Sequence, residues 1–145
     1  MKKLILMLGI VTPLLFAAQP EKVENPEQKA LQSTMLTLSK GLMHIQQGIL
    51  TNSKEDILTG VRMLKRTEEG FLTSHGEAMQ KYMPENPKYA ISMAKQSEIN
   101  IERYTREMRS DILSNKDYDR VVRGYTNIMK ECVKCHQKLR RWEWR

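Results

Sequence analysis

The chain is short of cysteine, glycine, proline and aromatic residues, and each shortage excludes a class of protein. Its 145 residues include 2 Cys, 7 Gly and 5 Pro, and aromatic residues make up 6%. Two cysteines cannot build a disulfide-rich scaffold or a four-cysteine zinc ribbon. Few glycines and prolines argue against a loop-rich sandwich or barrel, because such folds need many turns. The length suits one domain with its own core.

The sequence also lacks a hydrophobic run of membrane-spanning length, and its one long apolar run lies at the N-terminus. This run covers residues 4–16 and is too short to cross a bilayer as a helix. Lys2 and Lys3 precede it, and the small residues Ala17 and Ala18 follow it. That arrangement is typical of a secretory signal peptide. We therefore expect the run to be cleaved off on export, with an uncleaved N-terminal anchor as the alternative.

The signal peptide defines the expected domain organisation. We expect residues 1–18 to be removed, residues 19–26 to form a flexible lead-in and residues 27–145 to fold as one domain. The mature protein should be soluble in the periplasm, an oxidising compartment, with no stable membrane insertion.

Strand-like alternation is absent, and apolar residues instead recur every three or four positions in four stretches. Such spacing predicts helices that each bury one face. The expected helices run from about Glu27 to Leu50, Lys54 to Phe71, Pro87 to Leu113 and Ser114 to Trp142. Mostly short connections favour an all-α, antiparallel up-down-up-down four-helix bundle.

Two capping patterns mark the expected starts of the second and fourth helices. Ser53 precedes Asp56 by three residues, and Ser114 precedes Asp117 by the same spacing. A serine followed three residues later by an acidic residue is a common helix N-terminus. We therefore expect Ser53 and Ser114 to be the N-caps.

Residues 132–136 read Cys-Val-Lys-Cys-His. The pattern C-x-x-C-H is the attachment signature of c-type haem. Two thiols about one helical turn apart can each add across one vinyl group of the same porphyrin edge, and the adjacent imidazole can then reach the iron. We therefore expect one covalently bound haem c, with Cys132 and Cys135 as its thioether residues and His136 as the proximal iron ligand. The expected export supports the haem prediction, because haem is attached to c-type cytochromes outside the cytoplasm.

Two other chemistries use closely spaced cysteines. A thioredoxin-like redox pair needs a βαβ setting, which the helical pattern does not provide. A zinc site needs two further ligands, and the remaining histidines are His44 and His75. We expect both histidines to be exposed, His44 opposite the apolar stripe of its helix and His75 in a loop.

The residue on the other side of the iron decides between electron transfer and gas binding. The mature chain offers eight methionines: Met35, Met43, Met63, Met79, Met83, Met93, Met108 and Met129. Met35 lies on the apolar stripe near the start of the first helix. In an antiparallel bundle that start lies near the end of the fourth helix, where His136 is located. Met43 lies about 80° further round the helix and ~12 Å along it, so Met35 is the expected distal ligand.

A four-helix bundle with one C-x-x-C-H near its C-terminus resembles the class II c-type cytochromes, the cytochrome c-prime superfamily. A second patch, Gln32-Ser-Thr-Met35, resembles the distal segment of that family. Leu31 stands where members often carry an arginine. In gas-binding members the position of Met35 is apolar and non-ligating, whereas in low-spin members it is methionine.

The resemblance thus implies a periplasmic one-electron carrier with His136 and Met35 as axial ligands, and no catalytic residues. A five-coordinate protein that binds nitric oxide or carbon monoxide is the alternative, and a haem peroxidase is a third that lacks an evident distal acid–base pair. The resemblance leaves open whether the chain is a monomer or a homodimer paired through its first two helices.

Positive charge is in excess, with 24 Lys and Arg against 17 Asp and Glu, a formal net charge of +7. Loss of Lys2 and Lys3 with the signal peptide leaves +5. The basic residues are interspersed with acidic ones and no nucleic-acid motif is present, so we expect no nucleic-acid partner. Basic residues near the attachment motif would instead steer an acidic redox protein toward the haem. The alternative is that they form only a solvated helix face.

Overall fold

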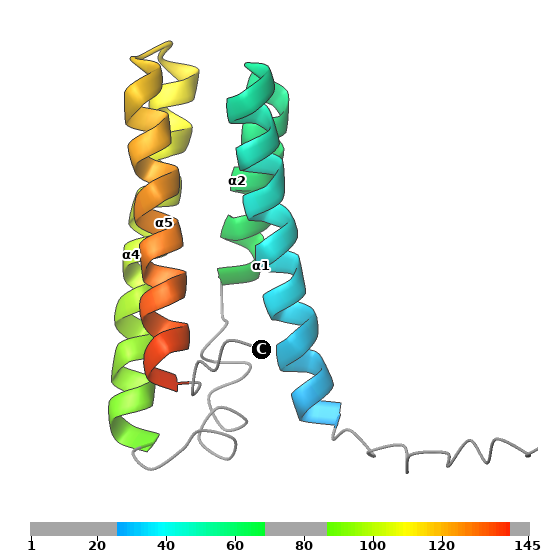
Figure 1. Ribbon diagram of the computed structural model, residues 1–145, viewed down its shortest axis with the longest axis vertical. Coiled ribbons are helices and arrows are strands. Elements are labelled where there is room, and N and C mark those ends of the chain that lie inside the picture. The colour runs from blue at the N-terminus through cyan, green and yellow to red at the C-terminus, as the bar shows by residue number, and fades with distance from the viewer. Residues whose placement is uncertain (1–25, 69–86, 140–145) are drawn as a thin grey trace, which may run out of the picture.

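A computed structural model describes residues 26–68 and 87–139, which form four helices and no strands. The helices are α1 (Pro26–Thr51), α2 (Lys54–Glu68), α4 (Pro87–Leu113) and α5 (Tyr118–Leu139). They alternate in direction as two hairpins, α1–α2 and α4–α5, with both interhelical turns at the same end (Figure 1). The expected all-α, up-down-up-down four-helix bundle is confirmed. The signal peptide, most of the lead-in, the segment 69–86 and residues 140–145 lie outside the described residues.

Both hairpin turns use an asparagine in the left-handed conformation. Asn52 has φ 55° and Asn115 has φ 52°, values that only glycine and asparagine adopt at little cost. The backbone N–H of Ser53 then donates to the carbonyl of Gly48 at 2.8 Å, and that of Lys116 donates to Asp111 at 3.0 Å. These six-to-one bonds satisfy carbonyls at the helix C-termini, as in a Schellman motif.

One of the two expected N-caps is correct and the other is wrong. The Asp56 N–H donates to Ser53 Oγ at 3.2 Å, so Ser53 caps α2. At α5 the cap is Asp117, whose Oδ1 accepts from the Asp119 N–H at 3.2 Å. Ser114 instead continues the α4 pattern, because its N–H donates to the carbonyl of Ser110 at 3.0 Å. The N-cap of α5 therefore lies three residues later than the serine pattern predicts.

Glycines let the backbones of α1 and α2 approach closely. A Cβ built on Gly60 would lie 2.4 Å from the carbonyl oxygen of Gly41, and one on Gly48 would lie 2.7 Å from the amide nitrogen of Ile57. Contacts this short exclude any side chain at these two positions. The first hairpin is therefore held together partly by direct backbone packing.

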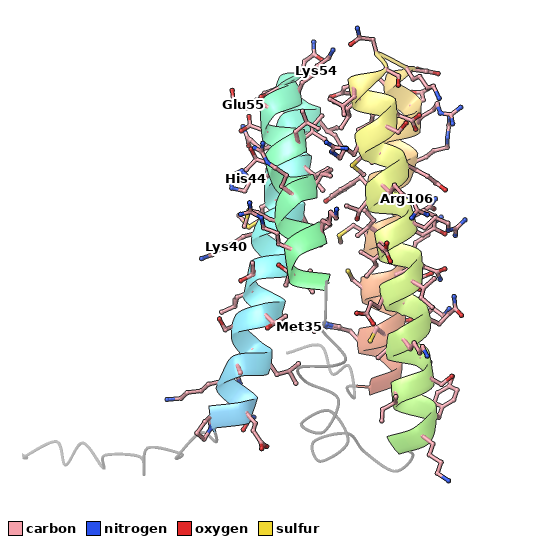
Figure 2. All side chains as sticks on the ribbon, turned by 180° about the vertical axis from the view of Figure 1, so that it is seen from behind. Met35, Lys40, His44, Lys54, Glu55 and Arg106 are labelled. Carbon is pink, nitrogen blue, oxygen red and sulfur yellow. The ribbon has the colours of Figure 1, made fainter. Side chains whose placement is uncertain are left out.

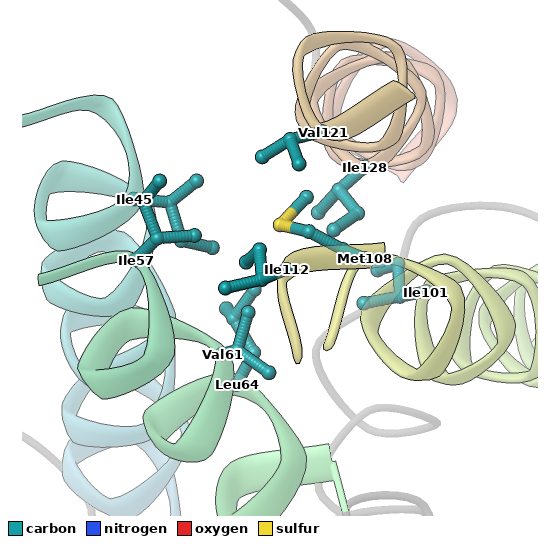
Figure 3. Close-up of a cluster of buried hydrophobic side chains, with 9 residues drawn as sticks. All are labelled: Ile45, Ile57, Val61, Leu64, Ile101, Met108, Ile112, Val121 and Ile128. Atoms are coloured by element: carbon teal, nitrogen blue, oxygen red, sulfur yellow. The ribbon is translucent and has the colours of Figure 1, made fainter. Parts of the chain in front are cut away.

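The two hairpins share one hydrophobic core, which lies toward the turn end of the bundle. It consists of Ile45, Ile57, Val61, Leu64, Ile101, Met108, Ile112, Val121 and Ile128 (Figure 3). Two polar contacts join the turns: the Tyr118 hydroxyl donates to the carbonyl of Ile49, and the Lys54 ammonium donates to Asn115 Oδ1. These contacts fix the position of one hairpin relative to the other along the bundle axis at this end.

A buried carboxylate stabilises the second turn. Asp111 lies 3.6 Å from the Lys116 ammonium and 3.3 Å from Arg120 Nε. A carboxylate in this position would be costly without partners, and two cations from the following residues compensate it. The pairing also favours the antiparallel arrangement of α4 and α5.

Candidate haem-attachment site

The attachment motif lies on the last turns of α5, at the end of the bundle away from the hairpin turns (Figure 1). Cys132, Cys135 and His136 are half-buried, whereas Val133 and Lys134 between them are exposed. Helical geometry produces this division, because residues three and four apart share a face and lie ~5 Å apart along the axis. The three side chains that the motif predicts to hold haem therefore share the inward side of α5. Neither thiol is in a disulfide.

The first thiol lies where the packed core ends. Ile128 is fully buried in the core cluster, and Cys132, one turn later on the same face, packs against that cluster as a partly buried side chain. The apolar stripe of α5 thus continues from the core into the attachment motif. A group attached to Cys132 would therefore adjoin the apolar interior of the bundle.

Counting residues along α1 and α5 places Met35 at about the height of Cys132. The hydroxyl of Tyr118 on α5 contacts the carbonyl of Ile49 on α1, which fixes the relative height of two antiparallel helices. Moving fourteen residues from this contact along each helix, ~21 Å at 1.5 Å per residue, reaches Cys132 on one and Met35 on the other. Figure 2 shows Met35 on the half of α1 away from the hairpin turns. His136 lies one helical turn beyond Cys132, so both candidate axial ligands are at the same end of the bundle.

The inward side chains at this end of α1 and α5 are only partly buried. Leu31, Met35 and Leu38 on α1 are only half-buried, although their stripe leads to the fully buried Ile45. The two thiols and the imidazole on α5 are half-buried in the same way. Two thiols, an imidazole and a thioether form the donor set of a covalently attached haem with two axial ligands. The residues present therefore suit haem c.

His44 and Met43 lie on other faces of α1 than Met35. His44 is exposed, as expected, and Figure 2 shows it with Lys40 on the outer side of α1. His75 lies outside the described residues. Met43 is 64% exposed and does not share the inward face of Met35. Within residues 26–68 and 87–139, no three His, Cys, Asp or Glu side chains form a cage for a bare metal ion.

A carboxylate beside the motif was missed in the sequence. Glu131, directly before Cys132, accepts hydrogen bonds from Ser97 Oγ at 3.2 Å and from Asn100 Nδ2 at 3.1 Å. Ser97 is buried, with 5% of its surface exposed. The sequence does contain one sign of this contact: Ser97 lies on the apolar stripe of the third helix. A buried hydroxyl requires a hydrogen-bond partner, so a polar residue on a neighbouring helix could have been expected.

Burial and charge shift two protonation equilibria at the site. Burial raises the pKa of the Cys135 thiol, and the nearby Glu131 carboxylate raises it further. Burial, and then the charge of Cys132, raise the pKa of the Tyr125 hydroxyl. Before attachment, the Cys135 side chain is therefore held as the neutral thiol around pH 7.

Comparison with known proteins supplies no relative. No protein family, no curated protein and no solved structure matches the chain. Across the described helices, none combines the length and apolarity required to span a bilayer.

Proposed function

We propose that this protein is a periplasmic monohaem c-type cytochrome that carries one electron. The observation that supports the proposal best is the arrangement of four side chains. Cys132, Cys135 and His136 share the inward side of α5, and Met35 lies on α1 at the same end of the bundle. The proposed signal peptide agrees, because it would deliver the chain to the compartment in which c-type haem is attached.

Each residue has a separate role in this proposal. Cys132 and Cys135 hold the haem as thioethers, so that it is not lost after export. The imidazole of His136 is the proximal ligand, and the thioether of Met35 is the distal one. The bound haem supplies an iron that alternates between two oxidation states. Ile128 and the core above the site exclude water from one side of it.

Exposed cations near the motif support an acidic redox partner. Lys130 and Lys134 are exposed on α5, on either side of Cys132. Arg123 is exposed two turns earlier on the same helix. A positive surface next to an electron-transfer site increases the rate of encounter with a negative partner and makes that rate fall with salt.

The deciding experiment is an absorption spectrum of the purified holoprotein in both oxidation states, with and without carbon monoxide. We expect low-spin spectra and slow or weak carbon monoxide binding, because methionine occupies the distal position. The chain with Cys132→Ala and Cys135→Ala should carry no haem that survives denaturation. A high-spin resting spectrum with rapid carbon monoxide binding would favour the five-coordinate gas-binding alternative. A protein without haem would contradict both.

We also propose that the protein pairs through the outer face of α1. Leu36, Met43 and Leu50 are 63%, 64% and 74% exposed, and they recur every seven residues along α1. A row of exposed apolar side chains on one helix face can pack against the same row of a second copy across a two-fold axis. Leu36→Glu with Met43→Glu should convert a dimer into a monomer in sedimentation velocity, whereas Ile99→Glu on α4 should not. A monomeric wild-type protein at micromolar concentration would contradict the proposal.

A further inference from the structure

A polar contact between α4 and α5 lies immediately beside the attachment motif. Each carboxylate oxygen of Glu131 accepts one hydrogen bond: Oε2 from Ser97 Oγ at 3.2 Å and Oε1 from Asn100 Nδ2 at 3.1 Å. Hydrogen bonds to a charged acceptor are about twice as strong as those between neutral groups. The two donors lie three residues apart on α4, and so occupy one face of that helix.

A third residue orients one of the donors. Gln96 Nε2 donates to Asn100 Oδ1 at 3.3 Å. This bond occupies the amide oxygen of Asn100 and leaves its NH₂ group directed toward Glu131. One of the two donors to the carboxylate is therefore itself held in place by a hydrogen bond on α4.

The bonds constrain the rotation of α5 about its own axis. Successive residues of a helix are 100° apart, so fixing the direction of Glu131 also fixes the directions of Cys132, Cys135 and His136. Sliding of α5 along α4 is restricted as well, because two donors on adjacent turns bind the same carboxylate. The contact thus controls both the rotation and the height of the attachment motif relative to α4.

We propose that Glu131 is the positioning residue of the haem site. Held by Ser97 and Asn100, its carboxylate keeps the attachment motif turned toward the interior of the bundle and places a negative charge beside the haem. This inference rests on the proposed haem function. A negative charge stabilises the oxidised iron, which carries one more positive charge than the reduced iron, so Glu131 lowers the reduction potential.

The test compares the holoprotein with Glu131→Gln and Glu131→Ala in spectroelectrochemical titrations at pH 7. Glutamine keeps the shape of the side chain and removes its charge. Its one amide oxygen can still accept from Asn100 Nδ2, while its NH₂ group would donate to the Ser97 hydroxyl. We expect the low-spin spectrum to persist and the ratio of reduced to oxidised protein at a fixed potential to rise about threefold to tenfold. A tenfold change corresponds to 59 mV for a one-electron couple. Alanine also removes the constraint on α5, so we expect a comparable rise together with a high-spin fraction.

Two further variants serve as controls. Glu102→Gln removes an exposed carboxylate that pairs with Arg106 on α4, and should leave potential and spectrum unchanged. Ser97→Ala removes one donor and keeps the charge, so it should produce a smaller high-spin fraction than Glu131→Ala. If Glu131→Ala does not fold, Ser97→Ala still tests whether the hydrogen bonds position the motif.

The outcomes separate this inference from the proposed function. A wild-type protein with low-spin haem whose potential and spectrum do not change in the Glu131 and Ser97 variants overturns the positioning role alone. If Glu102→Gln shifts the reduction potential as much as Glu131→Gln does, the inference is also overturned. The effect would then not depend on the position of Glu131. A wild-type chain without covalent haem overturns both.

Discussion

The Met35→Leu holoprotein should be high-spin and should bind carbon monoxide rapidly. Leucine nearly matches methionine in volume and keeps the apolar stripe of α1, so the bundle should fold with little loss of stability. It has no sulfur atom to coordinate iron, so the distal position is left without a protein ligand. The iron should change from six-coordinate to five-coordinate. The measurement is the absorption spectrum of both oxidation states with and without carbon monoxide.

The matched control is Met43→Leu on the same helix. Met43 is 64% exposed and lies two turns nearer the hairpin turn, where the register does not bring it opposite the attachment motif. We expect its spectrum and carbon monoxide binding to match those of the wild type. If Met35→Leu also leaves them unchanged, another residue occupies the distal position and the ligand assignment is wrong.

The fold could be predicted because it depends on periodicity. The stripes of α1 and α5 recur every three or four residues, and short turns force neighbouring helices to run antiparallel. Those two facts also place the start of α1 near the end of α5, which brings Met35 and His136 to one end of the bundle. The haem chemistry itself remains a prediction from the C-x-x-C-H pattern.

The start of α5 could not be predicted correctly because two local preferences compete. Ser114 and Asp117 both have side chains that cap a helix, and the sequence spacing favours the serine. In the structure, Asn115 adopts φ 52° and ends α4 there, so Ser114 belongs to the outgoing turn. The later residue, Asp117, then accepts the Asp119 N–H and starts the new helix.

Glu131 was missed for a different reason. Its partners, Ser97 and Asn100, are more than thirty residues away in the chain, and periodicity within one helix does not show which residues of two helices meet. Such contacts depend on the rotation of each helix about its axis, which the packing of the whole core determines.

Gly60 is a second residue whose role depends on a contact between helices. Considered within α2 alone, a glycine only makes the prediction of a helix weaker. Glycine disfavours helix by about 1 kcal/mol relative to alanine, and Gly60 lies in the middle of α2. The structure shows the compensating contact: the carbonyl of Gly41 and the amide of Ile45 occupy the space that a side chain would fill. A pairing between helices, and not a local preference, requires glycine there.

Gly60→Ala should therefore destabilise the protein, in spite of the higher helix propensity of alanine. The new Cβ would lie 2.4 Å from the Gly41 carbonyl oxygen and 2.8 Å from the Ile45 backbone nitrogen. Backbone atoms in a helix cannot rotate away, so α1 and α2 must separate. Overpacking of this kind costs about 1–3 kcal/mol or more, and we expect about 3 kcal/mol in chemical denaturation of the holoprotein.

Gly124→Ala on α5 is the matched control, because its nearest contact is the mobile end of a side chain. A Cβ there would lie 3.0 Å from Met108 Cε, and methionine rotates readily. The propensity gain should then dominate, leaving the stability unchanged or raised by up to ~1 kcal/mol. If the two alanine variants change stability equally, close packing does not hold α1 against α2. Because α1 carries Met35, separation of the helices should also raise the high-spin fraction in Gly60→Ala, and not in Gly124→Ala.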